Sequence, residues 1–127
     1  MTEGGPTAIV CDDAPGFRAL MTAMLSDAGL YVVGEAATWD ETERLAPGVD
    51  AILADLWMPE FDLEALARVR AVAPDATLAV VTALSLTDAA ARIASVEVDL
   101  LLGKTSPPAQ IAAAVAERAL GGASAAV

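Results

Sequence analysis

Apolar runs of strand length alternate along the chain with segments whose apolar residues recur at helical spacing. The predicted strands cover Thr7 to Cys11, Tyr31 to Gly34, Val49 to Ala54, Thr77 to Val81 and Val98 to Leu102. The predicted helices cover Pro15 to Ala28, a short acidic segment after a cap at Thr38 or Asp40, Leu63 to Ala73, Thr87 to Ser95, and Pro108 to Leu120. Five strand–helix units with short connections predict an α/β fold, with helices on both faces of a parallel sheet.

Residues with special backbone preferences mark the predicted helix ends. Pro15 and Pro108 suit a first helical turn, and Gly29 suits a stop. Thr87 is the expected cap of the fourth helix. The pair Gly121-Gly122 is expected to end the last helix, so that residues 1–120 form one domain and residues 121–127 a flexible tail or the start of a linker.

The predicted strands are apolar throughout, without alternation of polar residues, as in sheets that are buried on both faces. Right-handed crossovers leave few ways to connect such strands. We expect the flavodoxin-like, doubly wound sheet with strand order 2-1-3-4-5, in three α/β/α layers. This order places the first strand between the second and the third.

Polar side chains directly follow or close four of the five strands. Asp12 and Asp13 follow the first strand, and Asp55 follows the third. Thr82 follows the fourth strand, and Lys104 follows the fifth after one glycine. Because open α/β sheets bind ligands at the carboxyl ends of their strands, these side chains are expected to converge on one site.

The chemistry of this cluster points to a metal ion and a phosphoryl group. Three neighbouring carboxylates repel one another unless a cation lies between them, and oxygen ligands alone favour Mg²⁺, with Ca²⁺ or Mn²⁺ as alternatives. Lys104 could bind a phosphoryl oxygen, and the Thr82 hydroxyl and the Ala83 N–H would add neutral donors. Together these groups could carry a phosphoryl group on a carboxylate.

Composition excludes several other functions. The 127 residues include 18 acidic and 7 basic side chains, a net charge of -11, which argues against direct nucleic-acid binding. Histidine is absent from the sequence, so Ser-His or Cys-His catalysis, His-ligated zinc and a phosphohistidine donor are excluded. The single Cys11 lies in an apolar strand and is expected to be a buried, unreactive thiol.

No segment of the sequence predicts a membrane association. The longest uncharged apolar stretch, around Ala76 to Thr87, has about a dozen residues, too few to span a bilayer. The first residues, Met1 to Gly5, lack the basic and apolar pattern of a signal peptide. We therefore expect a cytoplasmic protein.

Five stretches in order resemble the receiver domain of bacterial two-component response regulators, from about Pro6 to Leu120. They are Val10-Cys11-Asp12-Asp13-Ala14-Pro15-Gly16-Phe17-Arg18, Val33-Gly34-Glu35-Ala36, Asp55-Leu56-Trp57-Met58-Pro59, Val81-Thr82-Ala83 and Gly103-Lys104. The first two look most like the NarL/FixJ class, whose members usually carry a C-terminal DNA-binding helix-turn-helix. The resemblance implies the CheY-like form of the flavodoxin-like fold.

The resemblance also implies a role for each matching residue. Asp55 would accept the phosphoryl group, and Thr82 and Lys104 would contact its oxygens, with the backbone of Trp57 and Ala83 nearby. The ligands of Mg²⁺ would be the carboxylates of Asp13 and Asp55 and the Trp57 carbonyl, with Asp12 acting mainly through a metal-bound water.

The chain departs from the family pattern at several positions, two of which bear on the switch and on the loop after the phosphoacceptor. Leu101 stands where the family has an aromatic residue that moves together with the threonine, so the expected switch pair is Thr82 with Leu101. Asp62-Leu63 stands where the loop after Met58-Pro59 usually has Asp-Gly, and the loop must take another path because that glycine often has positive φ.

The function expected from the resemblance is a switch that takes a phosphoryl group from a sensor histidine kinase. The output partner would be a downstream effector or a C-terminal DNA-binding domain that is not present in this chain. The expected fold is also compatible with a homodimer. The domain would catalyse its own phosphorylation and dephosphorylation without being a turnover enzyme. The alternatives are a degenerate receiver that signals by protein contact alone, and a hydrolase with Asp55 as nucleophile, which lacks the second acid of an Asp-x-Asp motif.

Overall fold

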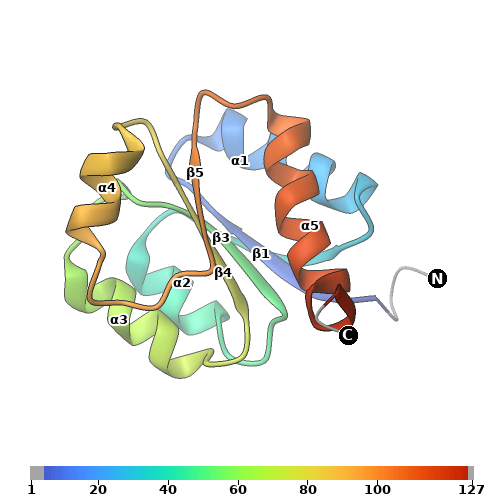
Figure 1. Ribbon diagram of the computed structural model, residues 1–127, viewed down its shortest axis with the longest axis horizontal. Coiled ribbons are helices and arrows are strands. Elements are labelled where there is room, and N and C mark those ends of the chain that lie inside the picture. Colours follow the sequence, from blue (N-terminus) through green and yellow to red (C-terminus); the bar gives the residue numbers. More distant parts are fainter. Residues whose placement is uncertain (1–4, 126–127) are drawn as a thin grey trace.

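The computed structural model describes residues 5–125, in which strands and helices alternate in the predicted order (Figure 1). The strands are β1 (Thr7–Cys11), β2 (Tyr31–Ala36), β3 (Ala51–Asp55), β4 (Thr77–Thr82) and β5 (Leu100–Gly103). The helices are α1 (Pro15–Asp27), α2 (Trp39–Leu45), α3 (Leu63–Val72), α4 (Leu86–Arg92) and α5 (Pro108–Ala125). All strand pairs are parallel, and the order β2-β1-β3-β4-β5 confirms the flavodoxin-like fold.

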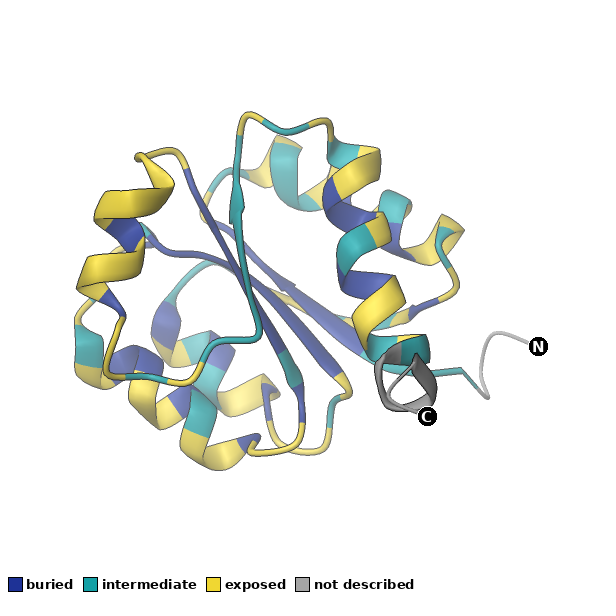
Figure 2. Cartoon of the chain, viewed as in Figure 1, coloured by how far each residue is buried: buried dark blue, intermediate teal, exposed yellow. Residues whose placement is uncertain are grey.

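The sheet separates two hydrophobic clusters, so the molecule has three layers (Figures 1 and 2). Neighbouring residues of β1 point to opposite faces: Ile9 joins the cluster under α2, α3 and α4, whereas Val10 joins the cluster under α1 and α5. Both faces of the central strands are therefore buried, which explains their lack of polar alternation.

The structure decides between the two predicted caps of α2 and corrects the predicted cap of α4. Of the two candidate caps for α2, Thr38 is the N-cap, and its hydroxyl accepts a hydrogen bond from the Glu41 N–H at 3.1 Å. The prediction of Thr87 as the cap of α4 is wrong, because Ser85 occupies that position and accepts from the Asp88 N–H at 3.1 Å. Both serine and threonine can cap a helix, so composition alone did not distinguish them.

Several element bounds differ from the predictions, and β3, predicted from Val49 to Ala54, covers Ala51–Asp55. β2 extends beyond Gly34 because Glu35 and Ala36 also pair with β1, and β5 begins at Leu100, two residues later than expected. α4 ends at Arg92, three residues before Ser95. Short elements of this kind depend on pairing with their neighbours more than on their own composition.

The last helix does not end at Gly121-Gly122, because α5 continues to Ala125. Glycine in a helix costs only about 1 kcal/mol relative to alanine, so it permits a helix as well as a stop. Residues 126 and 127 of the predicted tail lie outside the described residues, and the role of 121–127 as a linker stays a prediction. Within residues 5–125, none of the helices combines the length and hydropathy that a bilayer crossing requires.

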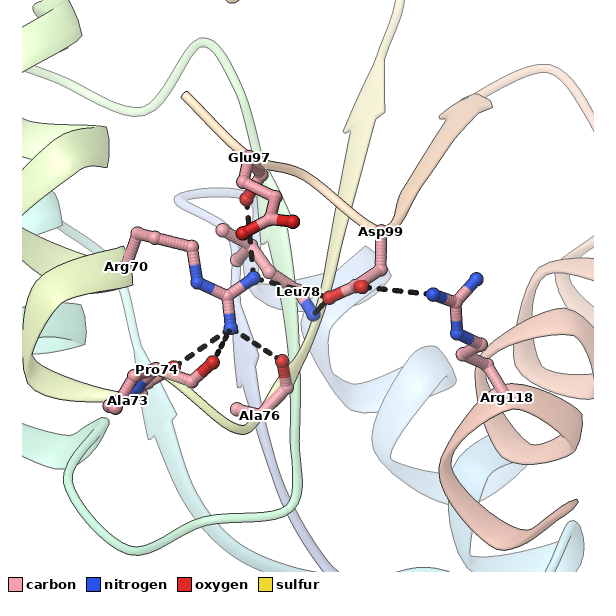
Figure 3. Close-up of polar contacts among 8 residues, drawn as sticks. All are labelled: Arg70, Ala73, Pro74, Ala76, Leu78, Glu97, Asp99 and Arg118. Atoms are coloured by element: carbon pink, nitrogen blue, oxygen red, sulfur yellow. Dashed lines mark hydrogen bonds and ion pairs between the residues drawn. The ribbon is translucent and has the colours of Figure 1, made fainter. Parts of the chain in front are cut away.

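Arg70 and Asp99 join α3, β4 and α5 at the amino-terminal edge of the sheet (Figure 3). The Arg70 guanidinium donates to the Asp99 carboxylate at 3.2 Å and to backbone carbonyls that include Ala76 at 2.6 Å. Asp99 also accepts from the Leu78 N–H at 2.8 Å and from Arg118 at 3.1 Å. The Asp99 N–H also donates to the Leu78 carbonyl at 2.9 Å, directly before β5 begins at Leu100.

Candidate functional site

The three acids predicted from the sequence lie together at the carboxyl edge of the sheet. Asp55 is the last residue of β3, and Asp12 directly follows β1, its neighbour in the sheet. One carboxylate oxygen from each of Asp12, Asp13 and Asp55 lies within 4.8 Å of the others. Asp12 and Asp55 are buried and Asp13 is exposed, so the cluster opens to solvent on one side.

Lys104 reaches this cluster from the end of β5. Its Nζ lies 2.8 Å from Asp12 Oδ2 and 3.3 Å from Asp55 Oδ2, and it also lies 4.6 Å from the centre of the Phe17 ring. The backbone sets this reach, because the Lys104 N–H donates to the Thr82 carbonyl and continues the pairing of β4 with β5. The ammonium is therefore held between two acids and an aromatic face.

The site raises two pKa values for different reasons. Burial raises the pKa of Asp55 above its ordinary value, although the Trp57 N–H and the Lys104 charge act in the opposite direction. For Lys104, burial opposes the charge, but the close contact with Asp12 at 2.8 Å and the negative charges of Asp12 and Asp55 outweigh it and raise the pKa. Both shifts indicate that the Asp55 carboxylate and the Lys104 ammonium have lost part of their hydration and depend on neighbouring opposite charges.

The oxygen atoms of the cluster fit a hard divalent cation. The Asp12 Oδ2 atom is buried and, among the described residues, makes no hydrogen bond of acceptable geometry although Lys104 is close. A buried carboxylate oxygen that has this ion pair but no hydrogen bond, beside two other carboxylates, is a ready ligand for Mg²⁺. The other oxygen of Asp12 accepts from the Ala14 N–H at 2.8 Å, which fixes the orientation of the carboxylate.

Thr82 lies at the end of β4 and is contacted by Trp57 from the β3–α3 loop. The Trp57 indole N–H donates to the Thr82 hydroxyl oxygen at 3.2 Å, and the Leu84 N–H donates to the same atom at 3.0 Å. The Trp57 backbone N–H donates to Asp55 at 3.2 Å. Ala83 is exposed and follows Thr82 directly.

Sequence reasoning missed three residues around the site. Phe17 was named only as part of a matching stretch, yet its ring lies against the Lys104 ammonium and also packs against the core. Arg18 donates to the Asp12 carbonyl at 2.7 Å and pairs with Glu35 at 3.0 Å. The Arg92 guanidinium lies 5.0 Å from the centre of the Trp57 ring. Apart from the contact between Arg18 and Asp12, which are six positions apart, these contacts join segments that are distant along the chain and have no local signal in the sequence.

The loop after Asp55 contains one left-handed residue, and Leu63, at the family's glycine position, is the first residue of α3. Glu60 has φ 65°, a left-handed conformation that is uncommon for a residue with a side chain. Leu101, the expected switch partner of Thr82, is partly buried and packs against the cluster under α4.

A comparison with protein families matches residues 8–116 to the response regulator receiver domain. The chain belongs to this family. The match covers all of the converging residues, so this receiver carries its acids, threonine and lysine at the places that the sequence predicted.

Cys11 is buried as expected, and burial raises the pKa of its thiol to about 12, which keeps the thiol protonated and unreactive.

Solved structures resemble the receiver over most of its length. The signal receiver domain of NarL from Mycobacterium tuberculosis is 26% identical, with a TM-score of 0.81, covering 92% of this chain and 98% of that one. A response regulator from Burkholderia pseudomallei with a phosphorylated aspartic acid and a calcium ion is 24% identical, with a TM-score of 0.76, covering 96% and 73%.

A third similar structure is the receiver domain of the sensor histidine kinase PA1611 from Pseudomonas aeruginosa, with a magnesium ion coordinated in its active-site cleft. It is 24% identical to this receiver, with a TM-score of 0.79, covering 93% of this chain and 99% of that one. The structures at 24% identity establish the fold alone. A comparison with curated proteins found no match.

Proposed function

We propose that this receiver takes a phosphoryl group on Asp55, with Mg²⁺ bound by the neighbouring acids, and thereby switches an interaction surface. The observation that carries the proposal is the buried Asp55 carboxylate, with two further acids within 4.8 Å and the Lys104 ammonium at 3.3 Å. The nucleophilic oxygen of Asp55, a site for a metal ion and the phosphoryl-binding ammonium of Lys104 are thus brought to one edge of the sheet.

The metal ligands proposed are the carboxylates of Asp12, Asp13 and Asp55 and the Trp57 carbonyl, with Asp12 acting mainly through water. Bound Mg²⁺ would neutralise charge on the acids and on the incoming phosphoryl oxygens. The buried Asp12 Oδ2, which makes no hydrogen bond, supports this assignment. So do the neighbours from Burkholderia and Pseudomonas, whose structures hold calcium and magnesium ions.

The transfer itself needs little chemistry from the protein beyond position and charge. A carboxylate oxygen of Asp55 attacks the phosphorus of a phosphohistidine, the P–O bond forms, the P–N bond breaks, and the imidazole leaves. Lys104 and the Thr82 hydroxyl bind the phosphoryl oxygens, and the backbone N–H groups at Trp57 and Ala83 add neutral donors. Lys104 would exchange its present contact with Asp55 for a contact with the phosphoryl group.

The partners proposed are a sensor histidine kinase as phosphodonor and a downstream effector or DNA-binding domain as output. The NarL receiver, at 26% identity, supports membership of the NarL/FixJ class. With that class we associate transcriptional output, a cytoplasmic location and dimer formation. Thr82 and Leu101 remain the proposed switch pair at the face of α4, β5 and α5.

Acetyl phosphate with Mg²⁺ tests the proposal directly. Intact mass of the wild-type protein should rise by one phosphoryl group, and a chelator should abolish the increase. Asp55→Asn should remove the increase. The matched control is Asp75→Asn, because Asp75 is an exposed acid in the turn before β4, at the other edge of the sheet.

The opposite result would favour a receiver that signals without phosphorylation. Wild-type protein that binds Mg²⁺ but never gains phosphoryl mass would support that alternative. Steady release of phosphate from small phosphoesters would instead revive the hydrolase. Either result contradicts the proposed switch.

A further inference from the structure

The side chain of Trp57 connects three parts of the site. Its indole N–H donates to the Thr82 hydroxyl oxygen at 3.2 Å, although the two residues are 25 positions apart in the sequence. Its ring packs edge-on against Phe61 at 5.6 Å and lies 5.0 Å from the Arg92 guanidinium of α4. The indole ring thus contacts both Phe61 and Arg92, and its nitrogen donates to Thr82, which is proposed to bind the phosphoryl group.

The hydrogen bonds to Thr82 restrict what its hydroxyl can do. A hydroxyl has one donor and two acceptor positions. Both acceptor positions of Thr82 are used, by the Trp57 indole N–H at 3.2 Å and the Leu84 N–H at 3.0 Å. The remaining direction carries the proton, and among the described residues no group accepts it. Thr82 is only 1% exposed, so its hydroxyl is a buried donor without a protein acceptor among the described residues, at the end of β4.

Leu101 stands at the position where the family has an aromatic residue that moves together with the threonine. A leucine cannot hydrogen-bond to the threonine and has less bulk than an aromatic ring. In this chain the aromatic residue in direct contact with Thr82 comes from the β3–α3 loop instead. That residue also touches α4, which is the element next to the end of β4.

We propose that Trp57 is the positioning residue for Thr82: its indole N–H orients the Thr82 hydroxyl as a donor to the phosphoryl group, and its ring couples that contact to Arg92 on α4. The inference rests on the proposed function, since it assigns Thr82 a phosphoryl oxygen to bind. It differs from the switch expected through Leu101, because the coupling runs through a side chain two residues after the phosphoacceptor.

A double-mutant cycle on the phosphorylation rate tests the inference. Trp57→Phe keeps an aromatic ring for Phe61 and Arg92 but removes the N–H donor. We expect it to slow phosphorylation by acetyl phosphate with Mg²⁺ by about three- to tenfold, the effect of losing one neutral hydrogen bond. In a Thr82→Val background, the same change should have almost no further effect. In a Thr82→Ser background, which restores the hydroxyl, the effect should return.

Trp39→Phe is the matched control. Trp39 also lies against Phe61, at 5.8 Å, but its buried indole nitrogen has no hydrogen-bond partner among the described residues. Replacing it removes an indole N–H that does not contact Thr82. We expect the rate to stay within about twofold of wild type, because no hydrogen bond is lost.

A second measurement does not depend on phosphorylation. In the unphosphorylated protein, the indole N–H resonance of Trp57 should shift when Thr82 is changed to Val, while that of Trp39 should stay in place. Beryllium trifluoride with Mg²⁺, as a phosphoryl mimic, should shift the Trp57 resonance in wild type. An Arg92→Ala variant should show a smaller shift.

The outcomes separate the two proposals. If wild type gains phosphoryl mass but Trp57→Phe matches it in rate, or if the effects of Trp57→Phe and Thr82→Val multiply, the inference is wrong and the proposed function stands. An unchanged indole resonance in Thr82→Val also overturns it. If wild type takes up neither phosphoryl group nor mimic, the proposed function fails and the inference fails with it.

Discussion

The Asp55 carboxylate lies where its charge is costly. Burial raises its pKa, so the folded protein holds the Asp55 proton more tightly than the unfolded chain does. By linkage, the ionised residue lowers the free energy of unfolding at pH values above its folded pKa, and the cost disappears below the unfolded pKa. Residues that serve chemistry often reduce stability in this way.

We therefore expect Asp55→Asn to raise the free energy of unfolding at neutral pH without Mg²⁺. The gain should shrink as the pH falls and vanish below about 3.9, the ordinary pKa of aspartic acid, since both proteins are then neutral at this position. Urea unfolding at several pH values measures it. Asp75→Asn, at an exposed position, should show little gain, and a gain for Asp55→Asn that is constant with pH would contradict this account.

The backbone conformation of Glu60 also lowers the free energy of unfolding. Its φ of 65° lies in the left-handed region, where a side chain costs about 1–2 kcal/mol. Replacing Glu60 with Gly should raise the free energy of unfolding by about 0.5–1 kcal/mol, the relief of strain less the added entropy of the unfolded chain. Glu60→Ala should bring no such gain in chemical denaturation, and equal stability of the two variants would contradict the strain.

Between elements, the contacts of Arg70 hold α3, β4 and the entry to β5 together. Arg70 makes five hydrogen bonds in this region, including those to Asp99 and Ala76. Its side chain is only 14% exposed, so loss of the guanidinium would leave several carbonyls and a carboxylate without a donor. These contacts fix the amino-terminal edge of the sheet, opposite to the acid cluster (Figure 3).

We expect Arg70→Met to lower the free energy of unfolding by about 2–4 kcal/mol, because buried polar partners lose their donor. Arg118→Ala is the matched comparison. Arg118 contacts the same Asp99 but is 48% exposed, so its loss should cost less than about 1 kcal/mol. Thermal and urea unfolding measure both changes, and equal losses would show that burial does not decide the cost.

At the scale of the whole molecule, charge is strongly unbalanced. The net charge of -11 adds to the repulsion that the acid cluster creates at one edge. A cation that binds there only in the folded state must therefore raise the stability of the whole domain.

Magnesium should raise the melting temperature in a saturable way. At a concentration about ten times the dissociation constant, binding adds about 1.4 kcal/mol to the free energy of unfolding. Differential scanning calorimetry at constant ionic strength measures this gain. Asp13→Asn should weaken the response and Asp75→Asn should keep it. A response equal to that of sodium chloride would show general screening in place of a site.

The order of the strands and the place of the acids followed from the chain because both depend on local pattern and general rules. Apolar runs identify buried strands, right-handed crossovers bring all carboxyl ends to one edge, and Asp12, Asp55 and Lys104 then have to meet. Helix ends were less certain. Ser85 and Thr87 are both capping residues, and Gly121 permits either a stop or a continuing helix.

The contacts that tune the site could not be foreseen in this way. Phe17 under Lys104, the Trp57 indole on Thr82 and Arg92 over Trp57 each join residues that are far apart in sequence. Hydrogen bonds and ring contacts form or fail over about an ångström, which no periodicity resolves. Residue order was therefore sufficient to place a charged nucleophile, its cation site and its lysine, whereas three-dimensional packing selected which neighbours orient them.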